Sequence, residues 1–393
     1  MNAPRILFVD DEPDILEGLR LALRKQRQEW DMDFACGGAE AITALEKRNA
    51  DVVVTDMRMP GMDGAELLAL VRSRWPDTVR LVLSGHADGE TLLRAMPVAH
   101  QFLSKPLQLD LLKGVMNRAI GLQKKLSSPS VRFLASKIGD LPSMPGTYNN
   151  LIRTIQDPTG TLASISAIVE SDPLVTGRVL KLINSAYYSL GQEVSSVRSA
   201  VSLLGPKVLM AMAMEGAVLE HASRLEVTSE YLEGLKTHSS RCCSWVRRLL
   251  PEGQHREEIL TMALIHDLGA PLMAITADPD TKAHYQRFLA HGHSTIEQEI
   301  QFFGTHHAEL GAYLFGLWGL PLNIVEAVAY HHTLTLPGGV EPGPVAALHA
   351  CDVLSAAEDD RAFLQEANLG LIRDSGLEDR FNALAAERPR ETP

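Results

Sequence analysis

The chain of 393 residues has few cysteines and no excess of basic residues. Its four cysteines form no CxxC pair and no zinc-finger spacing, so we expect buried or incidental thiols in a reducing cytoplasm rather than a disulfide framework. The 37 Lys and Arg residues stand against 49 Asp and Glu residues, which gives a net charge of -12. This balance argues against general affinity for the phosphate backbone of nucleic acids.

A long apolar run is also missing. The longest, around residues 208–219, is interrupted by Glu215 and falls short of the roughly 20 apolar residues that cross a bilayer. The N-terminus passes from a short apolar strand directly into acidic residues, without the pattern of a signal peptide. We therefore expect a cytoplasmic protein that does not associate with membranes, in which residues 208–219 form a buried helix.

The residues that are present indicate an ordinary globular protein with two domains, since 45% are hydrophobic and 22% are charged. From residue 5 to about residue 126, short apolar runs alternate with amphipathic segments, which is typical of a parallel sheet with crossover helices. We expect a doubly wound α/β domain over residues 1–126. Its five strands are predicted at Ile6–Val9, Met32–Ala35, Val52–Thr55, Val79–Leu83 and Gln101–Leu103.

Helical periodicity dominates the rest of the chain. The polar stretch SSPS at 127–130 favours a domain boundary, and we place a linker at 127–140. An all-α domain is expected at 141–355, followed by a helical extension and a disordered tail at 356–393. The predicted helices of this half include Leu162–Glu170, Leu174–Ile183, Ser229–Leu250, Glu257–His266 and Leu322–His331.

Several polar residues close the predicted strands of the first domain. Asp10 and Asp11 follow the first strand, Asp56 the third, Ser84 the fourth and Lys105 the fifth. The carboxyl ends of parallel strands share one edge of the sheet, so these residues should converge there. Crowded carboxylates repel one another unless a cation intervenes, and an all-oxygen cluster suits Mg²⁺. A carboxylate in such a site can attack phosphorus while a lysine and a hydroxyl stabilise the oxygens.

This combination of residues resembles the receiver domain of response regulators over residues 1 to about 125. The resemblance rests on VDDE at 9–12, TDMRMPGMDG at 55–64, Ser84, and KP at 105–106. It implies a flavodoxin-like fold. It also implies that Asp56 is the phosphoacceptor and that Mg²⁺ is held by Asp10, Asp11, Asp56 and the backbone carbonyl of Arg58.

Further roles come from the same resemblance. Lys105 would contact the phosphoryl group, Ser84 would be the switch hydroxyl, and Pro106 would follow a cis peptide bond. Phe102 occupies the family's aromatic switch position, while an apolar core role on a strand is the other interpretation. The implied partner is a cognate sensor histidine kinase.

Histidine is the unusual feature of the second half, where most of the 14 histidines lie. An adjacent His-Asp pair and a His-His pair are ligand types that suit Fe, Mn or Zn. Their order resembles the ligand sequence of the HD and HD-GYP phosphohydrolases. The candidate ligands are His238, His266, Asp267, His307, His331, His332 and Asp352. The alternative is an inherited polar core in which these side chains hydrogen bond to one another.

A second resemblance covers more of this half, residues 141–352, and identifies the HDOD domain, a degenerate relative of that superfamily. Its marks are LPSMP at 141–145, SDP at 171–173, LINSAYY at 182–188, AVSLLG at 200–205 and WGLP at 318–321. The family is regarded as a regulatory or scaffolding module without established catalysis. In addition, residues 333–344 lack the Gly-Tyr-Pro loop of the HD-GYP enzymes.

The leading hypothesis is therefore a two-component response regulator in which phosphorylation of Asp56 controls a helical signalling scaffold. Its output would be contact with an unknown downstream protein or a change in its own homodimer contacts. The alternative is a phosphorylation-regulated, metal-dependent phosphohydrolase that acts on a cyclic dinucleotide or another phosphoester. We expect no catalysis from the helical domain. DNA binding ranks last, because the sequence has no clear basic recognition helix.

Overall fold

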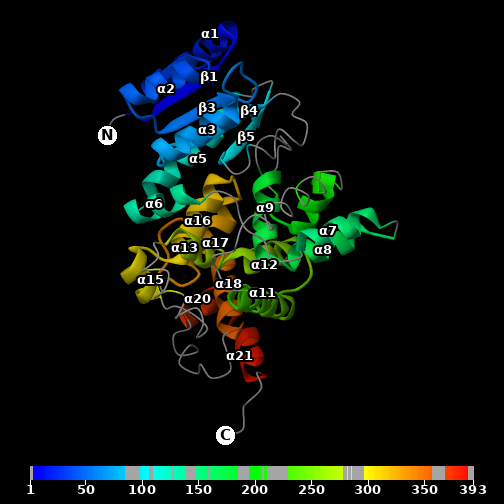
Figure 1. Cartoon of the computed structure of the whole chain (residues 1–393). Coiled ribbons are helices and arrows are strands. Elements are labelled where there is room, and N and C mark those ends of the chain that lie inside the picture. The colour runs from blue at the N-terminus through cyan, green and yellow to red at the C-terminus, as the bar shows by residue number, and fades with distance from the viewer. Residues whose placement is uncertain are drawn as a thin grey trace. The chain divides into compact units, whose positions relative to one another are not determined.

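The computed structural model describes residues 3–84, 95, 98–105, 109–125, 128–138, 147–157, 159–184, 194–205, 208–209, 212, 229–277, 281, 285, 296–333, 335–355 and 368–387. The chain divides into two compact units. The first comprises Met1–Leu141 with the short segments Lys181–Glu193 and Leu314–Gly319, and the second holds the remainder. Figure 1 labels the elements of both units.

A five-stranded parallel sheet forms the centre of the first unit. Its strands are β1 (Arg5–Asp10), β2 (Asp31–Cys36), β3 (Val52–Asp56), β4 (Val79–Ser84) and β5 (Gln101–Ser104). Their order is β2-β1-β3-β4-β5, and every neighbouring pair is parallel. This is the order of the flavodoxin-like doubly wound fold, so the fold class and all five predicted strands are confirmed.

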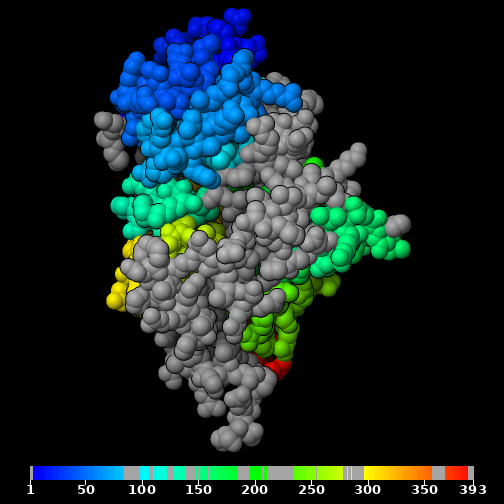
Figure 2. Space-filling model, in the orientation of Figure 1, coloured from blue at the N-terminus to red at the C-terminus, as the bar shows by residue number. Residues whose placement is uncertain are grey.

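The strands are apolar because helices flank the sheet. All residues of β1 and of β3 are buried, as expected for central strands covered on both faces. The flanking helices include α1 (Pro13–Ala22), α2 (Gly38–Lys47), α3 (Gly64–Arg74) and α5 (Leu109–Lys125). In the space-filling view the described side chains of this unit pack into a continuous surface (Figure 2).

The stretch that we expected to be a linker contains a helix. Ser128 accepts a hydrogen bond from the backbone N–H of Val131 and caps α6 (Pro129–Lys137), whose first residue is a proline. Serine before proline is a strong helix start as well as a turn signal, so the pattern SSPS begins a helix here. Val131 and Leu134 of α6 are buried, and the first compact unit extends to Leu141.

Helices make up the described part of the second unit, as predicted, and the ends of two of them, 181–183 and 314–317, belong to the first unit. They are α7 (Thr147–Gln156), α8 (Leu162–Glu170), α9 (Pro173–Ile183), α11 (Ser229–Leu249), α12 (Gln254–Ile265), α13 (Gly269–Thr276), α15 (Ile296–Phe303), α16 (His307–Leu317), α17 (Leu322–Tyr330), α18 (Pro342–Ser355), α20 (Leu369–Asp374) and α21 (Glu378–Ala386). Helices α11, α12 and α18 pack against one another at its centre. Most of residues 208–219, and the tail from 388, lie outside the described residues.

The centre of this unit is strongly apolar. Within the described residues, one helical stretch, His255–Thr276, is long and apolar enough to cross a membrane, with a mean hydropathy of 1.5. However, 83% of its most apolar window is buried inside the folded chain. A core helix of a globular protein has the same composition, so this stretch is weak evidence for a membrane span.

Candidate functional site

One candidate site lies at the carboxyl edge of the sheet, where β1 ends at Asp10 and β3 ends at Asp56. Both carboxylates are buried. The ammonium group of Lys105, directly after β5, lies 2.8 Å from Asp10 Oδ2 and also forms an ion pair with Asp56 Oδ1. The sheet topology therefore brings together three residues that are far apart in sequence, as predicted from the strand ends.

Backbone groups orient the two carboxylates. The N–H of Arg58 donates to Asp56 Oδ2 at 2.7 Å, and the N–H of Glu12 donates to Asp10 Oδ1 at 3.0 Å. The loop after β3 runs so close to the strand that a Cβ atom at Gly64 would lie 2.3 Å from the carbonyl oxygen of Asp56. Only glycine permits this approach, so Gly64 helps to set the position of Asp56.

Lys105 compensates the negative charge of the edge. Partial burial by itself lowers the pKa of the Lys105 ammonium, but the hydrogen bonds and charges of Asp10 and Asp56 outweigh it and raise the pKa above its usual value. The lysine therefore stays protonated at physiological pH. Its position beside Asp56 Oδ1, the oxygen that does not accept from the Arg58 N–H, suits contact with an incoming anionic group.

The structure describes only some of the other residues that were predicted for this site. Asp11 follows β1 directly and is half-buried. Ser84 ends β4 in register with Ser104, while its side chain and all of Pro106 lie outside the described residues. Phe102 is buried in β5, which favours its interpretation as a core residue over an exposed switch. The oxygen-rich donor set of the edge fits Mg²⁺, the usual ion of receiver domains.

A second candidate site lies inside the helical unit, where all seven predicted ligands come together. Together with Cys242 they form two groups, His238, Cys242, His266 and Asp352, and Asp267, His307, His331 and His332. His238 and Cys242 are one turn apart on α11, Asp352 lies on α18, and His307 begins α16. The His-Asp and His-His pairs directly follow α12 and α17, so each pair projects from a helix end.

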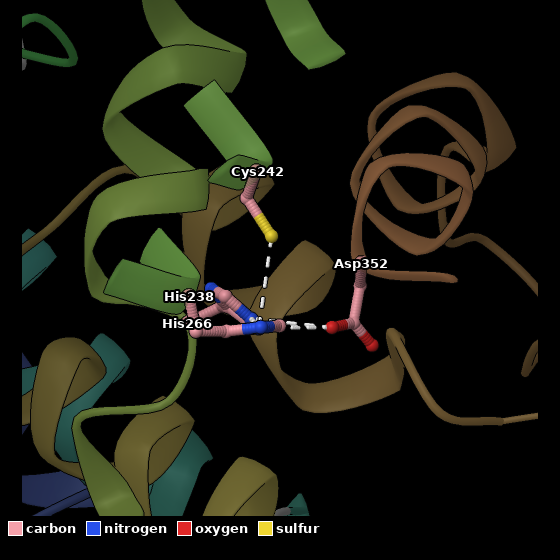
Figure 3. Close-up of side chains that lie close together, drawn as sticks. All are labelled: His238, Cys242, His266 and Asp352. Carbon is pink, nitrogen blue, oxygen red and sulfur yellow. Dashed lines mark hydrogen bonds and ion pairs between the residues drawn. The ribbon is translucent and has the colours of Figure 1, made fainter. Parts of the chain in front are cut away.

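The first group converges on His238 (Figure 3). Its Nε2 atom lies 3.2 Å from His266 Nε2, 3.1 Å from Asp352 Oδ1 and 3.6 Å from Cys242 Sγ. His266 Nε2 lies 3.7 Å from the same Asp352 oxygen. The four side chains come from α11, the end of α12, and α18, which are the helices at the centre of the unit.

Asp267 connects the two groups. Its Oδ2 atom lies 3.3 Å from the Nε2 atoms of both His238 and His266, and its Oδ1 atom lies 3.3 Å from His307 Nε2 and 3.8 Å from His331 Nε2. His332 Nε2 lies 3.1 Å from His307 Nε2. One carboxylate thus faces two clusters of imidazole nitrogens, which is the placement of a bridging ligand.

The outer nitrogens of three imidazoles are held by acceptors. Nδ1 of His266 donates to the Ala263 carbonyl at 3.0 Å, Nδ1 of His307 to Glu299 Oε2 at 2.8 Å, and Nδ1 of His331 to the Val328 carbonyl at 2.7 Å. In the neutral imidazole these bonds place the proton on Nδ1 and the lone pair on Nε2, which faces the cluster. Metal-binding histidines in proteins have this same outer support.

The inward lone pairs need a proton or a cation. Burial lowers the pKa of His331, and among the described residues its Nε2 atom makes no hydrogen bond, since the facing Asp267 Oδ1 atom lies 3.8 Å away. The buried Oδ2 atom of Asp352 makes no hydrogen bond either and lies 3.9 Å from His332 Nδ1. Burial of a polar atom without a partner is unfavourable, so these two atoms indicate that the cluster is built for a ligand. Its nitrogen, oxygen and sulfur donors fit Fe, Mn or Zn.

The carboxylates of the cluster balance its histidines. Burial alone raises the pKa of Asp267, but the charge of His266 and the facing imidazoles of His307 and His331 hold it well below its usual value. For His307, burial lowers the pKa, yet the charges of Glu299 and Asp267 and its hydrogen bonds to them raise it well above the usual value. The cluster therefore retains anionic carboxylates that can offset a cation.

Two residues of this site were not among the predicted ligands. Cys242 joins the first group, and Glu299 accepts hydrogen bonds from the backbone N–H and from Nδ1 of His307, both at 2.8 Å. The spacing of Cys242 four residues after His238 is a signal that helical geometry could have supplied, because such residues share a face. Glu299 has no such signal, since α15 had not been predicted.

Two domain families match the chain. The response regulator receiver domain matches residues 6–117, and the HDOD domain matches residues 141–334. The hydrogenase transcriptional regulatory protein HoxA of Cupriavidus necator is 29% identical over 181 residues, which cover 42% of this chain and 36% of that protein. The response regulator protein PilR of Pseudomonas aeruginosa is 30% identical over 154 residues, 36% of this chain and 34% of that protein. The matches thus span about a third of each of these relatives.

Solved structures provide a further comparison. A virulence factor from Campylobacter jejuni superposes with a TM-score of 0.54 at 19% identity and covers 66% of this chain and 95% of its own, which shows a shared fold. The MmoQ response regulator from Methylococcus capsulatus has a TM-score of 0.48 at 23% identity, covering 63% of this chain and 98% of its own. With the sheet order and the two matched domains, the chain belongs to the response regulators that join an N-terminal receiver domain to a C-terminal HDOD domain.

Proposed function

We propose that a sensor histidine kinase phosphorylates this protein on Asp56 and that the phosphorylated receiver controls the HDOD domain as a signalling module. The observation that carries this proposal is the contact of one ammonium group, that of Lys105, with the carboxylates of both Asp10 and Asp56. The carboxylate of Asp56 forms the new bond to phosphorus, and the donor leaves with the electron pair of the bond that breaks. Lys105 is placed to stabilise the phosphoryl oxygens.

Mg²⁺ completes the site in this proposal. Asp10, Asp11, Asp56 and the backbone carbonyl of Arg58 would hold the ion, which would offset the repulsion between the carboxylates and the phosphoryl donor. The Arg58 N–H occupies Asp56 Oδ2, so Oδ1, on the side of Lys105, is the oxygen available for attack.

The helical unit acts as the output module in this proposal. We infer that it operates through contacts with a downstream protein or through a homodimer, because the HDOD family is a regulatory module and residues 333–344 lack the loop of the catalytic relatives. Phosphorylation would bias a two-state receiver and so change which contacts the chain makes.

The experiment is incubation of the full chain with a small phosphodonor, with and without Mg²⁺, followed by intact mass spectrometry. Wild type should gain one phosphoryl group in a Mg²⁺-dependent reaction, and Asp56→Asn should gain none. Asp51→Asn is the matched control, because Asp51 lies at the opposite end of β3 and accepts a hydrogen bond from the Arg5 N–H. Equal labelling of Asp56→Asn and wild type would contradict the proposal.

A second candidate function is metal binding in the helical unit. It is supported by the inward Nε2 atoms of His266, His307 and His331 around the carboxylate of Asp267. The ions would be held by His238, His266, Asp267, His307, His331, His332 and Asp352, and Fe, Mn or Zn suit these donors. Such an ion would supply a Lewis acid for phosphoester hydrolysis, which keeps a phosphohydrolase as the alternative function.

Elemental analysis of purified protein without a chelating tag tests metal binding. We expect stoichiometric transition metal in wild type and a clear loss in His307→Ala. His306→Ala is the matched control, because His306 neighbours His307 in sequence but belongs to neither ligand group. Wild-type protein that contains no transition metal, even after incubation with Zn²⁺, Mn²⁺ or Fe²⁺, would favour the hydrogen-bonded polar core.

A further inference from the structure

The sulfur atom of Cys242 belongs to the first ligand group of the helical unit. Cys242 Sγ lies 3.6 Å from His238 Nε2, and the donor atoms of His238, Cys242, His266 and Asp352 all lie within 4.8 Å of one another. Figure 3 shows the thiol pointing from α11 toward the two imidazoles, with Asp352 beside them. The thiol is completely buried.

The distances fit coordination of one ion by these four atoms. Zinc bonds of about 2.0–2.1 Å to nitrogen and about 2.3 Å to sulfur imply tetrahedral edges of about 3.4 Å between nitrogens and about 3.5 Å between nitrogen and sulfur. The observed nitrogen pair lies 3.2 Å apart, and the nitrogen and sulfur of His238 and Cys242 lie 3.6 Å apart. His238 Nε2 and Asp352 Oδ1 lie 3.1 Å apart. The remaining pairs lie within 4.8 Å, so the four atoms would have to draw closer together to form four bonds to a central ion.

The hydrogen bonds around the sulfur are compatible with a thiolate. Ser355 Oγ lies 3.0 Å from Cys242 Sγ and 2.6 Å from the Cys351 carbonyl oxygen, both of which can accept its single proton. Donation to the sulfur would stabilise a thiolate, as outer hydrogen bonds do for other metal ligands. Cys242 Sγ also lies 3.7 Å from the Cys351 carbonyl oxygen, to which the protonated thiol donates, and metal binding would release this proton.

The two ligand groups differ in exposure. In the first group the side chains of His266 and Asp352 are 0% and 7% exposed. In the second group those of Asp267 and His332 are 17% and 23% exposed. Structural zinc sites are closed by protein ligands, whereas catalytic sites keep a position open. Asp267 Oδ2 also lies 3.3 Å from His238 and His266, so a sulfur ligand would fill a further protein position in the buried group and close it.

We propose that Cys242 is a thiolate ligand that closes the first metal position and makes it selective for Zn²⁺ or Fe²⁺ over Mn²⁺ and Mg²⁺. The inference rests on the metal centre proposed above. Thiolate is a soft ligand that favours zinc and iron, whereas carboxylate and imidazole alone accept manganese as well. The buried position would then hold the helices α11, α12 and α18 together, and any exchangeable ligand would bind at the more exposed second group.

The test is substitution of the metal in the full chain by Co²⁺, followed by absorption spectroscopy. Visible d–d bands report that Co²⁺ is bound, and a near-ultraviolet sulfur-to-cobalt band reports a thiolate ligand. In wild type we expect both the visible bands and the near-ultraviolet band. Cys242→Ser should lose only the near-ultraviolet band. Cys243→Ser should retain both kinds of band. Cys243 is the matched control, because it is buried on the same helix with its Sγ 3.7 Å from the Leu260 carbonyl oxygen and belongs to neither ligand group.

The outcomes separate the two proposals. Visible bands without the near-ultraviolet band in wild type would overturn the role of Cys242 and leave the metal centre intact. No visible bands at all would overturn both. If Cys242→Ser fails to fold, X-ray absorption of zinc-loaded wild type decides, since a thiolate ligand places sulfur at about 2.3 Å and a set of nitrogen and oxygen ligands does not.

Discussion

The Nε2 atoms of His238 and His266 face each other 3.2 Å apart in the centre of the helical unit. The Nδ1–H of His266 donates to the Ala263 carbonyl, so neutral His266 presents a lone pair to His238. Either one shared proton or one cation satisfies this pair. The carboxylates of Asp267 and Asp352 adjoin both rings and favour positive charge between them.

Removal of bound metal should destabilise the helical unit. A ligand present at 100 times its dissociation constant stabilises the folded state by about 2.7 kcal/mol, so chelation should lower the midpoint of the corresponding thermal transition. Differential scanning calorimetry before and after chelation, and after readdition of Zn²⁺, measures the effect. Asp267→Ala should show little response to either treatment, and an equal response in this variant would place the metal elsewhere.

Hydrolysis of cyclic dinucleotides should be absent, even with Mn²⁺ or Fe²⁺ supplied and the receiver phosphorylated. Metal ligands alone do not position a substrate, and positioning can contribute on the order of 7 to 11 kcal/mol to a reaction. Residues 333–344 lack the tyrosine-bearing loop of the catalytic relatives. Chromatography of the products tests this expectation. A linear or mononucleotide product that disappears in a folded Asp267→Ala variant would establish the phosphohydrolase instead.

Gly64→Ala should destabilise the receiver domain by about 1–3 kcal/mol, because the new Cβ would lie 2.3 Å from the backbone oxygen of Asp56. Gly18→Ala is the matched control at an exposed position of α1, where a Cβ meets nothing within 4 Å. That change should stabilise the domain by up to about 1 kcal/mol. Calorimetry measures the thermal midpoints of both variants. Similar changes in the two midpoints would show that the backbone after β3 can move to accept the new Cβ without loss of stability.

His100 should remain neutral well below pH 6.5. Burial first, and then the charge of Arg80, holds the pKa of His100 well below its usual value, and the Arg80 N–H donates to its Nδ1 atom at 3.1 Å. In the unfolded chain His100 is protonated near pH 6.5, whereas in the folded chain it stays neutral to a lower pH. The contribution of neutral, buried His100 to the free energy of unfolding is therefore present above pH 6.5 and is lost as the pH falls toward the pKa of the folded state. NMR titration, with His100→Gln for assignment, should show no midpoint near 6.5. A midpoint there would contradict the buried position.

The fold of the first unit could be predicted from the sequence because strand alternation and helix periodicity repeat five times. All five strands lie where apolar runs predicted them, within one or two residues at each end. The helix α6 could not be recognised, because a serine and a proline that begin a helix also occur at turns. Its start depends on the burial of Val131 and Leu134, which local sequence does not reveal.

The site in the helical unit was predicted through its residue types and their order. The sequence could not show that Asp267 faces both histidine groups, because that relationship depends on how α11, α12, α16 and α18 pack. It also could not show that Glu299 supports His307, since the pairing of α15 with the start of α16 is a tertiary contact. Contacts of this kind follow from packing and not from local pattern.

The measurement that tests the central claim most directly is mapping of the phosphorylated residue in unmutated protein. The full chain is labelled by a phosphodonor with Mg²⁺, reduced with borohydride to trap the acyl phosphate, digested, and sequenced by mass spectrometry. We predict that the trapped residue is Asp56, because its carboxylate is the one held by both the Arg58 N–H and the Lys105 ammonium. A trapped residue at Asp10, Asp11 or any carboxylate outside this edge would contradict the account.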